Sequence, residues 1–203
     1  MFIAKKLKKE NIVEYLLYMW QIEDIIRAYG CSLSVIEKNY ISKFDYSDDQ
    51  KADEADWFGN LIRMMNSEGK REQGHLDINN IVLKDLNELH NALLNSNNYP
   101  FYNAEYYKVL PFIVEIRNKN RQAEKRIREE GSTEMPAIDA SEDKSEIETC
   151  LEVLYGIMLL RMQNKKISPE TENAVKEITT FVGMLSDYYQ QDKEGKLKGL
   201  EQA

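Results

Sequence analysis

The stretch Glu14–Tyr29, EYLLYMWQIEDIIRAY, decides the fold class and raises a question about function. Apolar residues recur in and just before it every three or four positions, and they are Ile12, Leu16, Met19, Ile22 and Ile26. This period predicts a helix from Ala4 to Tyr29, which Gly30 ends. Glu23, Asp24 and Arg27 continue the apolar rows of that helix, so three charges face the expected core.

The rest of the chain has the same character. Nine glycines and four prolines in 203 residues favour long helices over a turn-rich β fold. Helical patterns cover Ser34 to about Lys43, Asp48 to Glu68, Ile78 to Leu94, Asn103 to beyond Arg117, Glu146 to Asn164 and Pro169 to Gln190. Pro111 predicts a kink or a restart. We expect an all-α, single-domain bundle of about six main helices over residues 1–203, with a flexible internal loop at 131–145 and a loose C-terminal tail at 191–203.

Net charge and cysteine content indicate which classes of partner to expect and in which cellular compartment the protein lies. The net charge is −8, and neither basic cluster, Lys5–Lys9 or Arg117–Arg128, is interleaved with aromatic residues, so we expect no nucleic-acid binding. No uncharged apolar run reaches about 18 residues, so we expect no membrane span. Cys31 and Cys150 favour two free thiols in the cytoplasm, and one long-range disulfide is the alternative.

Ionisable residues lie on the apolar side of four predicted helices. Besides the three charges near Arg27, they are His90, Arg117 and Arg161. One interpretation is structural: Arg27 pairs with Glu23 and Asp24, and the other groups find partners inside the bundle. The alternative is one pocket in which three arginines bind a carboxylate or phosphate and His90 donates or moves a proton.

Motifs for catalysis, metals and cofactors are missing from the sequence. A di-iron bundle needs two Glu-x-x-His pairs, and only EQGH at 72–75 has that spacing, in a glycine-containing connector. GxGxxG, P-loop, HExxH and GxSxG sequences do not occur. We therefore assign no catalytic residue, no metal ligand and no cofactor.

Four stretches together resemble a known family. They are ENIVEYLLYMWQIEDIIRAY at 10–29, EGKREQGHLDIN at 68–79, FYNAEYYKVLPFIVEIR at 101–117 and IETCLEVLYGIMLLRMQNKKISPET at 147–171. The chain, from Ile3 to about Leu197, resembles an uncharacterised bacterial family catalogued only as a domain of unknown function. The resemblance implies a small, cytoplasmic, all-helical protein and carries no site residues. The segment 121–143 is longer than expected for the family.

Two functions are consistent with the sequence. The first, which we favour, is a non-catalytic interaction or structural protein that binds an unknown protein or a second copy of itself as a homodimer. The face around Trp57, Phe58, Met64 and Met65 would carry that contact. The alternative is a binding protein, or an enzyme, for a small anionic metabolite held by the three arginines.

Overall fold

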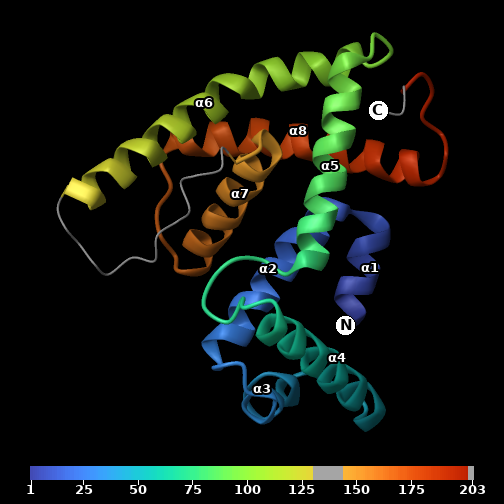
Figure 1. Cartoon of the computed structure of the whole chain (residues 1–203), viewed down its shortest axis with the longest axis vertical. Coiled ribbons are helices and arrows are strands. Elements are labelled where there is room, and N and C mark those ends of the chain that lie inside the picture. Colours follow the sequence, from blue (N-terminus) through green and yellow to red (C-terminus); the bar gives the residue numbers. More distant parts are fainter. Residues whose placement is uncertain (130–143, 201–203) are drawn as a thin grey trace. The chain divides into compact units, whose positions relative to one another are not determined.

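The computed structural model describes residues 1–129 and 144–200, which hold eight α-helices, one 3-10 turn and no strand (Figure 1). This confirms the all-α fold. The predicted loop at 131–145 lies almost entirely outside the described residues. The chain forms two compact units, 1–85 and 86–203, whose boundary falls within one helix, α5.

The first unit is built from short and medium helices. They are α1 (Phe2–Glu10), α2 (Ile12–Ala28), α3 (Leu33–Asn39), the 3-10 turn η1 (Ile41–Lys43), α4 (Asp48–Ser67) and the first half of α5 (Asp77–Asn95). Helix α1 packs on α2, and α3 packs on α4. Because Ser47 and Gln50 form a reciprocal capping box, α4 begins where the sequence predicts.

The predicted helix from Ala4 to Tyr29 is divided in two. Asn11 has extended backbone angles, and its side-chain oxygen accepts hydrogen bonds from the N–H groups of Val13 and Glu14, both at 3.1 Å. Asn11 therefore ends α1 and caps α2, a role for which asparagine is well suited. The prediction of one continuous helix was wrong at this residue.

The core of the first unit follows the predicted period. The five apolar residues of the α2 row are at most 1% exposed. On α4, Phe58 and Met65 are fully buried, while Trp57 and Met64 are partly exposed. The face that the sequence suggested for a partner therefore has its centre inside the core.

The second unit contains the remaining half of α5 and three longer helices. They are α6 (Pro100–Glu129), α7 (Glu146–Met162) and α8 (Pro169–Lys193). Helix α6 packs on α8 and on α7, and α7 also packs on α8 (Figure 1). Serine caps begin both later helices, since Ser145 accepts from the Glu148 N–H and Ser168 from the Thr171 N–H.

Pro111 does not interrupt α6, which is one helix from Pro100 to Glu129. Proline cannot donate to the carbonyl four residues earlier, here that of Tyr107. Both Pro111 and Tyr107 are exposed, so water can satisfy that carbonyl. Proline on the solvent side also matches the normal curvature of a helix that bends toward its core.

Residues 191–200 continue α8 and contact the turn between α5 and α6. Helix α8 continues to Lys193, beyond the predicted end at Gln190. The Tyr99 hydroxyl donates to the Lys198 carbonyl at 2.9 Å, and Ser96 donates to the Gly199 carbonyl at 3.1 Å. These bonds attach residues 198–199 to the turn between α5 and α6.

Candidate functional site

Glu23 is the centre of a buried polar cluster in the first unit. The residue is fully buried on α2, and its carboxylate accepts from the Leu76 N–H at 2.9 Å and from the Asn79 side-chain amide at 2.7 Å. Its second oxygen lies 2.7 Å from Nδ1 of His75, whose ring stacks on Trp20 with centroids 4.2 Å apart. A negative charge at the start of a helix is favourable, so Glu23 secures the beginning of α5 to α2.

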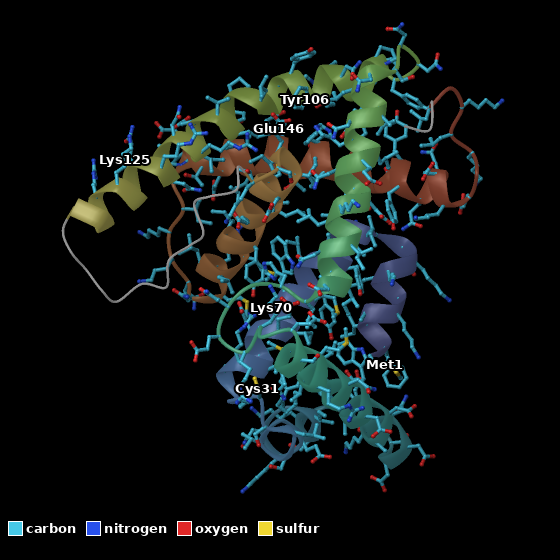
Figure 2. The ribbon with its side chains drawn as sticks, viewed as in Figure 1. Met1, Cys31, Lys70, Tyr106, Lys125 and Glu146 are labelled. Carbon is cyan, nitrogen blue, oxygen red and sulfur yellow. The ribbon has the colours of Figure 1, made fainter. Side chains whose placement is uncertain are left out.

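Arg27 holds the connector that leads from α4 to α5. Its guanidinium donates to Asp24 at 2.8 Å, to the Lys70 carbonyl at 3.3 Å and to the Gly74 carbonyl. Lys70 is labelled on this connector in Figure 2. A planar guanidinium can serve several acceptors at once, and here two of them are backbone carbonyls. Arg27 and Glu23 thus bind successive parts of one connector.

A second polar cluster surrounds His90 inside the second unit. His90 is 3% exposed on α5. Its Nδ1 lies 2.7 Å from the Tyr102 hydroxyl and its Nε2 lies 3.4 Å from the Glu146 carboxylate. The Tyr106 hydroxyl donates to the other Glu146 oxygen at 3.1 Å, and the two residues lie close together in Figure 2. Phe181 packs against the His90 ring with centroids 5.8 Å apart.

Burial determines which groups of this cluster carry a proton at pH 7. It lowers the pKa of His90, although the hydrogen bond to Glu146 opposes the shift, so the imidazole is neutral at pH 7. Burial raises the pKa of Tyr102 and, together with the bond to Glu146, raises the pKa of Tyr106 to about 12. A neutral His90 that donates from Nε2 to Glu146 accepts from Tyr102 at Nδ1. The polar groups of this cluster are thus paired with one another, and the histidine ring is buried among them.

Arg117 performs on α6 the role that Arg27 performs on α2. Its Nε donates to the Thr149 hydroxyl at 3.3 Å, and its Nη2 donates to the Lys144 carbonyl. Thr149 in turn donates to the Ser145 carbonyl at 2.9 Å. Because these acceptors lie around the first turn of α7, Arg117 fixes the place where that helix begins against α6.

Arg161 has a different environment. It is exposed and lies in the last turn of α7. It lines an open pocket of about 430 Å³ between α7 and α8. The other lining residues are Leu154, Ile157, Met158, Met162, Val175 and Thr179. The pocket is therefore apolar, with one cation at its edge.

The six residues suggested by the sequence fall into three separate settings. Glu23, Asp24 and Arg27 belong to the unit 1–85 and share one connector. His90 and Arg117 both contact residues in the first turn of α7, Glu146 and Thr149 respectively. Arg161 is twelve residues beyond Thr149 on that helix, about 18 Å along its axis. Arg117 and Arg161 consequently do not share a pocket.

An exposed apolar stripe on α6 is a further feature, which the sequence analysis did not identify. It consists of Phe101, Ala104, Tyr107, Pro111 and Val114, all of them exposed. Phe101 is 79% exposed, Tyr107 67% and Val114 49%. The buried residues of α6, such as Val109, lie on the other side, about 160° around the helix from Tyr107. We call these five residues the α6 stripe.

Two absences apply to the described residues. Within 1–129 and 144–200, no group of three or more His, Cys, Asp or Glu side chains is placed to hold a metal ion. Across the same ranges, no helix combines the length and the apolar character needed to cross a membrane.

Comparison with known protein families identifies a relationship. A family model described as a domain of unknown function, DUF4924, matches residues 1–133 and 132–196. No curated protein and no solved structure matches the chain. The match agrees with the resemblance expected from the sequence, and it adds no functional residue.

Proposed function

Since the chain belongs to the DUF4924 family, a domain of unknown function, its role must be inferred from its own surface, and we propose that it is a non-catalytic interaction protein. The α6 stripe would bind an apolar helix face of a protein partner. The observation that carries the proposal is the exposure of two aromatic side chains, Phe101 and Tyr107, on a helix whose opposite side is already packed. Aromatic residues are enriched at the centres of protein interfaces.

The hydrogen bonds of the buried and half-buried ionisable groups support this proposal. Arg27 and Arg117 donate to backbone carbonyls, and Glu23 accepts from a backbone N–H. His90 is buried and has a partner at each ring nitrogen. Groups used in this way hold helices together and are not free to bind a substrate.

We also infer that the protein is cytoplasmic. Both cysteines, Cys31 and Cys150, are free thiols in the structure, and persistent free thiols are usual in reducing compartments.

A photoreactive amino acid at Tyr107 tests the interaction in the cells that naturally make the protein. We expect a discrete covalent adduct that disappears when Phe101→Glu is introduced into the same chain. The control places the same group at Asn120, an exposed polar position on a different side of α6. Adducts of equal yield at both positions, or adducts that persist with Phe101→Glu, would overturn the proposal.

The pocket beside Arg161 supports a second function, the binding of a small amphipathic anion. Its volume of about 430 Å³ is within the range of small-molecule sites, and its apolar walls with an exposed arginine suit an aliphatic carboxylate. Octanoate at one hundred times its Kd would stabilise the chain by about 2.7 kcal/mol. Thermal unfolding with octanoate, repeated with Arg161→Gln, measures this effect. An unchanged Tm for the parent chain, or the same rise in Tm with the variant, would contradict it.

A further inference from the structure

We propose that the partner of the α6 stripe is a second copy of this chain, with the two α6 helices antiparallel about a twofold axis. This inference rests on the proposed function and names its partner. In an isologous dimer the same patch is used twice, so the patch must be complementary to its own rotated copy. The spacing of the stripe meets this requirement.

Four of the five stripe residues lie symmetrically about the midpoint between Tyr107 and Lys108. When two identical helices pack antiparallel, opposing residue numbers have a constant sum. A sum of 215 places Phe101 opposite Val114 and Ala104 opposite Pro111. It also places Tyr107 opposite Lys108, so the two copies of Tyr107 lie on either side of the axis. Every stripe residue thus meets an apolar residue or, at the centre, the alkyl stem of Lys108.

Large and small residues alternate across this contact. The two Tyr107 rings occupy the centre, and Ala104 opposite Pro111 leaves room for them on each side. A parallel arrangement would instead place each residue opposite its own copy, with Phe101 against Phe101 and Ala104 against Ala104. The rings would then meet at two levels and leave a gap between them. The antiparallel arrangement fills the contact more evenly, as close packing requires.

Charge complementarity favours the same register. Helix α6 has no acidic residue in its first turn, so the positive end of its dipole lacks a negative partner there. In the antiparallel register Glu115 lies opposite Pro100, the first residue of the other copy's α6. Glu115 is exposed on α6, where it forms an ion pair with Lys119. Its carboxylate would therefore lie near the positive end of the other helix's dipole, twice per dimer.

The exposed area indicates a weak dimer. A buried aromatic side chain covers roughly 150–250 Å², so Phe101 and Tyr107, at 79% and 67% exposure, leave on the order of 300 Å² in water. Two copies with the smaller stripe residues bury about 1,000 Å² in total, near the lower limit for a specific interface. We expect a Kd in the micromolar range.

Sedimentation of the full chain over a wide concentration range tests whether the partner is a second copy of the chain. The parent should pass from monomer to dimer, and Phe101→Glu should weaken the dimer at least tenfold. Ile81→Glu is the matched control because Ile81, at 59% exposure, lies on α5 outside the stripe. Glu115→Gln should weaken the dimer about three- to thirtyfold, since two helix-end contacts are lost.

Cysteine cross-linking in a Cys31→Ser background tests the register. Tyr107→Cys should form a disulfide with its own copy, whereas Phe101→Cys should do so only when mixed with Val114→Cys. Efficient self-linking of Phe101→Cys would overturn the antiparallel arrangement.

The two proposals can fail separately. A parent chain that stays monomeric while Tyr107 adducts contain a different protein would overturn the second copy as partner and leave the interaction function standing. A monomer without stripe-dependent adducts would overturn both.

Discussion

Replacement of Glu23 by alanine should strongly destabilise the first unit. The carboxylate is fully buried and serves two donors that have little access to water, the Leu76 N–H and the Asn79 amide. The side-chain oxygen of Asn79 is already buried without a hydrogen-bond partner within the described residues, so this amide has little capacity to rearrange. Each stranded buried donor costs about 1–3 kcal/mol. His75 is 30% exposed and can turn toward water, so its loss adds little.

The expected cost of Glu23→Ala is therefore about 4 kcal/mol, near the middle of the range for two stranded donors. Glu23→Gln keeps one oxygen for both donors and loses only the charge and the contact with His75, so we expect about 1–2 kcal/mol. Asp24→Asn is the control from the same helix turn, because the Asp24 side chain is 49% exposed, and it should cost less than about 1 kcal/mol.

Tryptophan fluorescence during urea unfolding measures these changes in the relevant unit. Trp20 and Trp57 are the two tryptophans of the sequence, and both lie in the unit 1–85. The signal therefore reports that unit even if the two units unfold separately. A loss below about 1 kcal/mol for Glu23→Ala would show that the carboxylate does not hold the start of α5. Equal losses for alanine and glutamine would show that the lost charge, not the stranded donors, determines the cost.

Three further results are expected. Because the pKa of His90 lies below its ordinary 6.5, the stability from its neutral form is complete above pH 6.5 and is lost as the pH falls through the lowered value. Stability measured against pH should lose this dependence with His90→Gln. Burial raises the pKa of Cys150 to about 12, so this thiol should react only in denaturant. Cys31 is partly exposed, and a thiol reagent should modify it in the native protein. Mass spectrometry of the adducts measures both results. Arg117→Met should cost about 2 kcal/mol in urea unfolding, because Arg117 loses its bonds to Thr149 and Lys144. Arg161→Met should cost less than about 0.5 kcal/mol, because Arg161 is exposed. Equal costs would contradict this.

Local signals in the sequence were sufficient for most of the secondary structure. The three-and-four spacing on α2 predicted a row that is buried almost completely. The predicted start of the last helix at Pro169 is confirmed, and Ser168 caps it. Asn11 was missed because apolar residues keep the helical period across it, and only its backbone angles reveal a cap. At Pro111 the sequence does not show whether the freed carbonyl faces water or the core, and this decides whether the helix continues.

The polar clusters could be predicted only in part, because their members are distant in sequence. Periodicity correctly placed Glu23 and His90 on core-facing sides, where both are buried. It could not identify their partners, since Glu23 and His75 are separated by 52 positions and His90 and Glu146 by 56. Arg27 and Arg117 were harder still, because their main acceptors are backbone carbonyls, and any residue can supply one.

The same reasoning explains why the α6 stripe escaped the sequence analysis. A helix that packs on one side gives one apolar row, and the helical period alone does not show that the apolar residues of this segment form two. In the structure α6 has two apolar rows on opposite sides, one around Val109 and one around Tyr107, and only the first packs inside its unit. Two of the three arginines predicted on core-facing rows, Arg27 and Arg117, instead hold a connector and a helix start, whereas Arg161 is exposed. A buried charge on an apolar row therefore marks a place where chain segments are joined, whereas a second apolar row on a packed helix marks a surface available to a partner.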